Sequence, residues 1–139
     1  MMALYKMARR LYLKKIPLLP KVICRLIRLF FACEIPYTAE IDFSVEFAHN
    51  GLGCVIGHRA VIGKNCKILS NVTIGGRSRI PANPVLGENV SVGAGAVLLG
   101  DIHIGDNVSV GANAVVINDV PDGMIAVGVP AINKERKHY

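Results

Sequence analysis

The strongest constraint on the fold of this chain is an aliphatic residue that recurs at every sixth position. Seven of these residues are followed directly by glycine, and most are followed four positions later by a small or branched apolar residue. A period of six is neither the period of about 2 of a half-buried strand nor that of about 3.6 of a helix. Ten residues keep the phase: Ile56, Ile62, Ile68, Ile74, Leu86, Val92, Leu98, Ile104, Val110 and Val116.

This spacing predicts an all-β fold, a parallel β-helix of hexapeptide repeats. Each short strand turns one aliphatic side chain inward and then reaches a corner, where Gly or Asn can adopt a positive φ. Three sides make one coil of about 18 residues, and several coils must stack because one coil cannot bury its inward row alone. The composition agrees, since the chain is 52% hydrophobic but only 6% aromatic, with no Trp.

The basic residues are concentrated before the repeat. Eight of the 16 Lys and Arg precede Glu34, and no acidic residue does. The other eight basic residues stand against all ten acidic residues, so residues 34–139 carry a net charge of −2. The overall charge of +6 therefore belongs to the N-terminal segment, and we expect no nucleic acid as a partner of the repeat.

The N-terminal segment predicts two helices, over residues 3–15 and 21–32, because Pro17 and Pro20 forbid a continuous helix. Two interpretations stay open. The helices either cap the β-helix or a neighbouring subunit, or they form a basic amphipathic segment at an anionic membrane surface. No apolar run reaches the roughly 18 residues of a spanning helix. The four cysteines show no CxxC spacing and follow no secretory signal, which predicts reduced thiols in a cytoplasmic protein.

Two irregularities interrupt the repeat. Residues 75–85, GGRSRIPANPV, predict a loop projecting from one corner, although Ile80 keeps the phase and leaves a distorted side open. The stretch FAHNGLGCVIG contains a slip, since Phe47 and Ile56 are nine positions apart. After Val120 the chain leaves the repeat in a Pro/Gly-rich loop. We predict a helical segment over 1–33, a repeat domain over 34–133 and a basic tail over 134–139.

The stretches HNGLGCVIG, AVIGKNC, SNVTIGG, VSVGAGAVLLGDIHIGDNVSVGANAVV and AVGVPA resemble the serine acetyltransferase branch of the left-handed β-helix acyltransferases. The resemblance covers roughly residues 34–133 and is greatest to short members from polysaccharide biosynthesis clusters. It implies a left-handed coil, acetyl-CoA as co-substrate, and a homotrimer with active sites between subunits.

His49 lies in the irregular stretch, and its own surroundings allow either a surface histidine or a base. Acetyl transfer to a hydroxyl needs a base, and an imidazole suits that task near neutral pH. The resemblance implies that His49 is this base and that Glu34, fifteen residues earlier, is its acidic partner. We expect His58 and His103 to be solvated, and we expect no metal site.

The resemblance also implies where the co-substrates bind. The positions that match acetyl-CoA contacts are small residues and a basic one: Gly75, Gly76, Gly93, Ala94, Gly111, Ala112, Gly128, Pro130 and Lys134. Arg136 and Lys137 are further candidates for the CoA phosphates. The expected acceptor contacts are Asn50, Arg77, Arg79 and Asn83.

Departures from the family bear on the acceptor. Ala48 stands where serine acetyltransferases carry Asp, Ala82 and Asn83 stand where they carry Arg-His, and only about 33 residues precede Glu34 in place of a large helical domain. A serine carboxylate and ammonium need counter-charges. We therefore expect the acceptor to be a sugar hydroxyl of a surface polysaccharide precursor. The first alternative is an acetyltransferase that acts on L-serine, and the second alternative is a non-catalytic β-helix scaffold. The expected location is the cytoplasm or the inner face of the cytoplasmic membrane.

Overall fold

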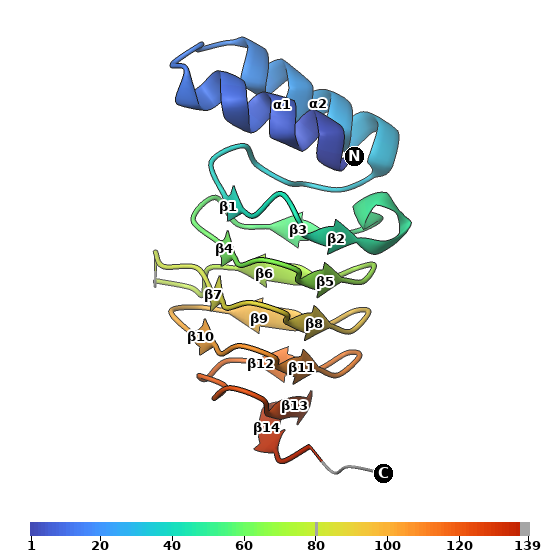
Figure 1. Cartoon of the computed structure of the whole chain (residues 1–139), viewed down its shortest axis with the longest axis vertical. Coiled ribbons are helices and arrows are strands. Elements are labelled where there is room, and N and C mark those ends of the chain that lie inside the picture. Colours follow the sequence, from blue (N-terminus) through green and yellow to red (C-terminus); the bar gives the residue numbers. More distant parts are fainter. Residues whose placement is uncertain (80, 137–139) are drawn as a thin grey trace.

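The computed structural model describes residues 1–79 and 81–136, and it shows a three-sided parallel β-helix closed at one end by two helices (Figure 1). Successive strands from β1 to β12 lie on different faces, so each face is a ladder of strands from successive coils. Face 1 holds β1 (Glu40–Ile41), β4 (Val61–Ile62), β7 (Val85–Leu86) and β10 (His103–Ile104). Face 2 holds β2 (Glu46–Phe47), β5 (Lys67–Ile68), β8 (Ser91–Val92), β11 (Ser109–Val110), β13 (Ile125–Gly128) and β14 (Ala131–Lys134). Face 3 holds β3 (Val55–Ile56), β6 (Thr73–Gly75), β9 (Val97–Leu99) and β12 (Val115–Val116).

The repeat aliphatics form the core, as the period predicts. All ten are at most 4% exposed, and the parallel register places them above one another, with Ile62 opposite Leu86 and Leu86 opposite Ile104. The apolar residues four positions later, such as Ala60 and Val108, are also buried and fill the corners from inside. Burial of one such aliphatic side chain contributes roughly 1.5–3 kcal/mol, so the stacked rows hold the coils together.

The glycines that follow the aliphatics have a different role from the one the sequence suggested. The left-handed corner positions belong mainly to asparagines: Asn65, Asn71, Asn89, Asn107 and Asn113, with φ between 56° and 59°. The motif glycines instead allow the next coil to approach closely. A Cβ on Gly63 would collide with the carbonyl of Gly87, and a Cβ on Gly93 would lie 2.5 Å from the amide nitrogen of Ala112.

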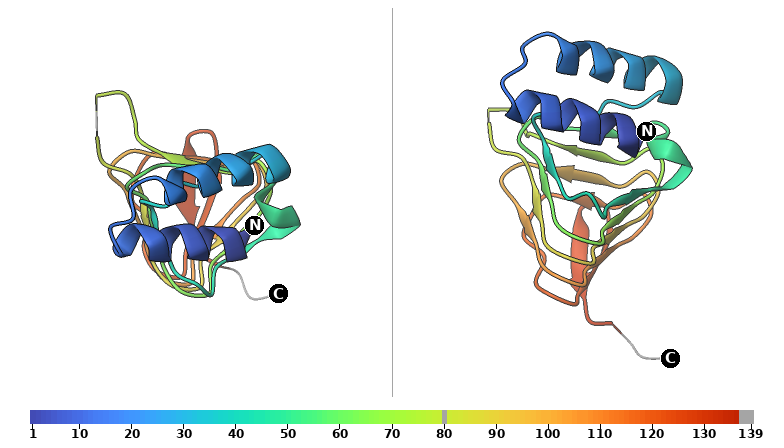
Figure 2. Two further views of the ribbon diagram at one scale, coloured as in Figure 1. Left: turned by 90° about the horizontal axis from the view of Figure 1, so that it is seen from above. Right: turned by 45° about the horizontal axis from the view of Figure 1, so that its top comes forward.

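Two corners of the coil hold most of the expected site residues. The histidine corner comprises the turns from face 2 to face 3, which are residues 48–54, 69–72, 93–96 and 111–114. The loop corner comprises the turns from face 3 to face 1, which are residues 57–60, 76–84 and 100–102. In the view from above, the 76–84 loop projects on the side away from the short helix η1 (Ala48–Gly51) (Figure 2).

The helices α1 (Met2–Leu13) and α2 (Leu19–Phe31) confirm the helical N-terminus and cap the first coil (Figure 1). Helix α2 begins before Pro20 because proline in the first helical turn costs no hydrogen bond. Tyr5 anchors α1. Its buried hydroxyl donates to the carbonyl of Ala39 at 2.7 Å and accepts from the Ile41 amide at 3.1 Å.

The stretch after Val120 is a strand hairpin, so its prediction as a loop was wrong. Strand β13 continues face 2 beneath β11, and β14 returns antiparallel to it. Ala126 is fully buried and fills the inward position below Val110. The six-residue period missed this strand because it pairs sixteen residues after β11 instead of eighteen. Lys134, predicted to begin the tail, is the last residue of β14.

Candidate active site at two corners of the coil

The imidazole of His49 stands on a strained turn at the head of the histidine corner. Phe47 is buried at the end of β2, and the chain then enters η1, where His49 and Asn50 have φ of 51° and 56°. A left-handed backbone conformation costs a non-glycine residue roughly 1–2 kcal/mol. Two such residues in succession are typical of a functional site, where the surrounding structure maintains the strain. The side chains of His49 and Asn50 are exposed, so the imidazole is free to meet a ligand.

This turn exists because the first coil contains three more residues than a regular coil of eighteen. Glu46 pairs with Lys67, twenty-one residues later, whereas Ser91 pairs with Ser109, eighteen residues later. The slip that the sequence shows at FAHNGLGCVIG is therefore an insertion at this corner. Gly51 is buried there, and a Cβ on it would lie 3.1 Å from Cε of Met1, so the helical cap packs against the turn.

Glu34 lies beside this turn but does not bond to the imidazole. Its backbone bridges to Val55 on face 3, and the thiol of Cys33 lies 4.0 Å from the carbonyl oxygen of Asn50. The Glu34 carboxylate is exposed and sits 3.5 Å from the guanidinium of Arg28. Within residues 1–79 and 81–136, the imidazole of His49 has no hydrogen-bond partner. The pairing of Glu34 with His49 stays a prediction.

Small residues continue the histidine corner below His49. Gly93 and Ala94 lie directly above Gly111 and Ala112, since β8 and β11 pair in register. The amide of Asn113 donates to the carbonyl of Ala94 at 2.9 Å, which fixes one turn upon the next. Ala112 is exposed, and the other three are partly exposed. The corner therefore presents a column of backbone with little side chain over it.

Gly75 and Gly76 lie at the other corner, where β6 ends and the loop begins. Gly75 differs from the other motif glycines, because a Cβ on it would meet no atom within 4 Å. The fold of one chain therefore does not require glycine there. Sequence reasoning gave no ground for this distinction, although Gly75–Gly76 is the one Gly-Gly pair of the chain.

The projecting loop carries the other expected acceptor contacts. Arg77 and Arg79 are exposed, and the Cβ of Arg77 packs near Gly100. Asn83 is half-buried against Gly57, with its amide 3.5 Å from the carbonyl oxygen of Pro81. Ile80, whose phase left a distorted side open, lies outside the described residues. The loop adds six residues, since Val61 pairs with Val85 twenty-four residues later.

One chain thus divides its expected site residues between two corners. His49, Asn50 and the column Gly93–Ala94 and Gly111–Ala112 lie at the histidine corner. Gly75, Gly76 and the arginines of the loop lie at the loop corner, at the opposite edge of face 3. A ligand that contacts both sets has to lie between two copies of the chain.

The remaining candidates lie toward the C-terminal end or on the coil surface. Gly128 and Pro130 are exposed beside the β13–β14 turn, and Lys134 is exposed at the end of β14. Arg136 donates to the carbonyl of Asn107 and to the hydroxyl of Ser109, at 3.1 and 2.8 Å, while Lys137 and His138 lie outside the described residues.

The other two described histidines are both exposed. Nδ1 of His58 lies 3.1 Å from the hydroxyl of Thr38, and His103 lies on β10. Among the described residues, no group of three His, Cys, Asp or Glu side chains is placed to hold a metal ion.

The four thiols are free and poorly suited to covalent catalysis. Burial raises the pKa of Cys24, Cys54 and Cys66, and burial raises that of Cys33 to about 11. A thiol is nucleophilic as the thiolate, so these groups are largely inert at neutral pH. Cys33, which lies beside Asn50, is therefore no acyl carrier for the site.

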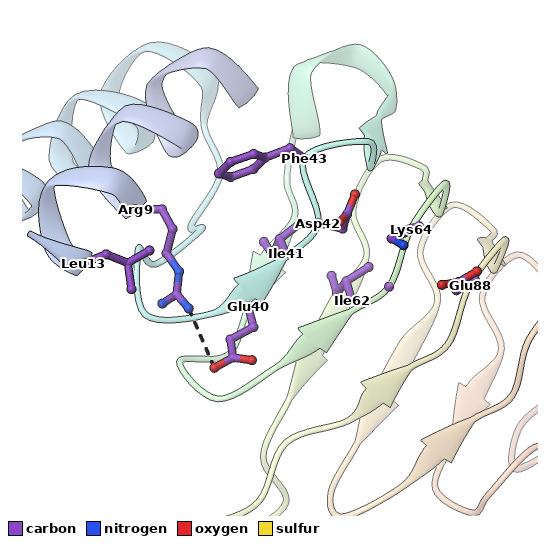
Figure 3. A pocket seen from close by; sticks show the side chains of 10 residues that line it. Arg9, Leu13, Glu40, Ile41, Asp42, Phe43, Ile62, Lys64 and Glu88 are labelled. Carbon is purple, nitrogen blue, oxygen red and sulfur yellow. Dashed lines mark ion pairs between the residues drawn. The ribbon is translucent and has the colours of Figure 1, made fainter.

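A hollow of about 420 Å³ lies on face 1 beneath α1, away from both corners (Figure 3). Arg9 pairs with Glu40 across it at 3.7 Å, and Lys64 faces Asp42 and Glu88. Three carboxylates against two cations do not suit a polyphosphate ligand. The hollow therefore does not compete with the corners as a site for CoA.

Comparisons with known proteins agree with this geometry. The family model of bacterial transferase hexapeptide repeats (six repeats) matches residues 83–118. A serine acetyltransferase of Synechococcus elongatus is 39% identical over 71 residues, which are 51% of this chain and 29% of that protein. The crystal structure of Neisseria gonorrhoeae serine acetyltransferase in complex with serine has a TM-score of 0.87 at 36% identity, covering 93% of this chain and 53% of that chain. A serine acetyltransferase in complex with CoA has a TM-score of 0.86 at 34% identity, covering 94% and 54%.

The three-sided coil and its repeat define a left-handed parallel β-helix of the hexapeptide type, which confirms the expected fold. Residues 83–118 match the hexapeptide-repeat transferase family, and serine acetyltransferases are homologues and structural neighbours of the chain. It spans about half the length of the solved serine acetyltransferases it matches.

Proposed function

We propose that this chain is an acetyl-CoA-dependent O-acetyltransferase that works as a homotrimer, with His49 as general base. The observation that carries the proposal is the exposed His49 on its left-handed turn, at the same corner of the coil as a column of small residues that begins two coils further along. A solved relative supplies the precedent, since it is a serine acetyltransferase in complex with CoA.

The proposed reaction is a direct transfer. The acceptor hydroxyl gives its proton to the imidazole of His49 while its oxygen attacks the thioester carbonyl carbon. The carbonyl oxygen becomes an oxyanion, which the backbone amides near Gly75 and Gly76 of an adjacent copy stabilise. Collapse of this intermediate breaks the carbon–sulfur bond, and the imidazolium returns the proton to the CoA thiolate. The inert buried thiols support direct transfer over an acyl-enzyme.

Glu34 orients His49 in this proposal. Its segment adjoins the η1 turn through the contact between Cys33 and Asn50. The carboxylate has to leave Arg28, which costs little because exposed ion pairs contribute only about 0–1 kcal/mol. In the bound complex, Glu34 would then fix the tautomer and stabilise the imidazolium.

Acetyl-CoA would lie between two copies. The histidine corner of one copy would offer Gly93, Ala94, Gly111 and Ala112, and the loop corner of the other would offer Gly75 and Gly76. Toward the C-terminal end, Gly128, Pro130 and Lys134 would meet the nucleotide. The open space at Gly75 supports this arrangement, because a backbone free of side chains admits pantetheine.

L-serine is the acceptor that the comparisons favour, since the matched relatives are serine acetyltransferases and one was solved with serine. Arg77 and Arg79 would supply the cations for its carboxylate. A sugar hydroxyl is the second candidate. It is favoured by Ala48 and Asn83, which leave the site without the aspartate and the arginine–histidine pair of the serine enzymes. No contact among the described residues favours a polysaccharide precursor over another sugar.

Release of free thiol from acetyl-CoA tests this proposal, measured with L-serine and with a panel of nucleotide-linked and lipid-linked sugars. Turnover with serine well above hydrolysis makes the chain a minimal serine acetyltransferase. Turnover with a sugar and none with serine assigns it to carbohydrate modification. No acceptor-dependent release with any hydroxyl, from protein that binds acetyl-CoA, contradicts the proposed activity.

A further inference from the structure

The outer side of helix α2 carries an apolar stripe that none of the described residues covers. Its residues are among the most exposed large apolar side chains of the molecule, and Leu29 and Phe30 are 75% and 71% exposed. Ile23 and Ile27 lie on the adjacent side of the helix and are buried against the rest of the protein. The α2 stripe comprises Leu18, Leu19, Val22, Leu26, Leu29 and Phe30.

Basic side chains border the stripe along its length. Lys21, Arg25 and Arg28 follow one another at helical spacing and are all exposed. Where α1 ends, the exposed Leu13 and Ile16 flank Lys14 and Lys15, which extends the same character to the neighbouring helix. The helices lie side by side across one end of the coil, so the stripe is at an extremity of the molecule (Figures 1 and 2).

We propose that the α2 stripe docks the protein on an anionic phospholipid bilayer. An apolar helix face bordered by Lys and Arg lies in the plane of the membrane interface, with its apolar side chains at the acyl boundary and its cations among the phosphates. The described residues include no helix that is long and apolar enough to span a bilayer. The surface is therefore suited to lie on the membrane.

The charge around the stripe favours an anionic bilayer over a second copy of the chain. Residues 1–33 contain eight Lys and Arg and no Asp or Glu. Two copies joined stripe to stripe would bring these cations against one another, and this repulsion would oppose the apolar contact. An anionic lipid surface offers acyl chains to the apolar stripe and phosphates to its basic border. The proposal does not depend on acetyl transfer, because it concerns a face of α2 that carries none of the proposed catalytic groups.

Co-sedimentation of the full chain with lipid vesicles tests the proposal. The probes are vesicles of phosphatidylcholine and vesicles that also contain phosphatidylglycerol. We expect binding to the second kind only, with an affinity that falls as salt screens the charges. The variant Leu29→Asn/Phe30→Asn should bind roughly tenfold or more weakly. Its matched control is Ile132→Asn, an equally large exposed apolar residue on β14, which should bind as the unmodified chain does.

A second pair of variants tests the border. Lys21→Gln/Arg25→Gln should bind about thirtyfold more weakly, since each basic side chain near an anionic surface contributes roughly fivefold. Lys64→Gln/Lys67→Gln removes the same charge from the coil and should change binding little. Thermal unfolding checks that each variant is folded.

Three results would overturn the proposal. The first is equal binding to both kinds of vesicle, and the second is unchanged binding by Leu29→Asn/Phe30→Asn. The third is a larger assembly of the unmodified chain that binds no vesicle and that Leu29→Asn/Phe30→Asn dissociates, which would assign the stripe to a second copy.

Discussion

At the scale of single residues, the backbone of His49 and Asn50 is the most informative feature. Two consecutive non-glycine residues in the left-handed region are costly, and the three-residue insertion provides the turn that holds them. The other left-handed asparagines stand singly at regular corners. A turn that only joined two strands would not need this strain, which is why we assign the site to it.

Gly75 is the motif glycine that the fold of a single chain does not require. We expect Gly75→Val to fold normally, because a Cβ meets nothing within 4 Å and β6 accepts a branched residue. The KM for acetyl-CoA should rise at least about tenfold, since the side chain fills the space for the thioester arm. Gly63→Val is the matched control and should destabilise the coil, because its Cβ collides with the Gly87 carbonyl. An unchanged KM in Gly75→Val would exclude this glycine from the cofactor path.

Buried thiols make the free energy of unfolding fall at alkaline pH. Burial raises the pKa of Cys33 to about 11 from its ordinary value near 9, so the folded state holds the proton more tightly than the unfolded state. This stabilisation is complete below pH 9 and is lost as the pH rises through 11, by roughly 2–3 kcal/mol. Denaturant unfolding between pH 8 and about 11 measures it. In Cys33→Ala the loss should be smaller, and an equal loss would mean that other groups cause it.

At the scale of elements, the sequence predicts the strands whose side chains form the regular inward rows. It misses a strand outside the six-residue period and side-chain contacts between elements. The six-residue period places all ten buried aliphatics, because each has to face the same interior. It misses β13, since a single inward Ala126 two residues out of phase leaves no periodic signal. It also cannot place the Glu34 carboxylate, because the competing Arg28 comes from another element, α2.

The helical cap is joined to the coil through the buried hydroxyl of Tyr5. Tyr5→Phe removes its two hydrogen bonds and leaves the Ile41 amide and the Ala39 carbonyl without that partner. We expect the free energy of unfolding to fall by about 1–3 kcal/mol. Chemical denaturation measures the change, with Tyr12→Phe as the control because Tyr12 is exposed. Equal stability of the two variants would show that the hydroxyl does not hold the cap.

At the scale of the whole molecule, the proposed site is divided between two corners, and this proposal implies an assembly of several copies. In a homotrimer, each site would take its histidine corner from one subunit and its loop corner from the next. His49→Ala and Gly75→Val should each be impaired alone. Mixed and reassembled, they should regain activity, because about a quarter of randomly formed sites then contain two unmodified corners. Failure to regain activity in mixed trimers would show that one subunit forms the site by itself.

In the proposed reaction, His49 removes the proton of the acceptor hydroxyl. The most direct measurement is the rate of thiol release from acetyl-CoA, with the best acceptor, by the unmodified chain, by His49→Ala and by His103→Ala. His103 is the control because it is an exposed histidine on β10, away from both corners. We expect kcat to fall about 10²- to 10⁴-fold in His49→Ala and to stay unchanged in His103→Ala. Turnover by His49→Ala at the rate of the unmodified chain would contradict the account.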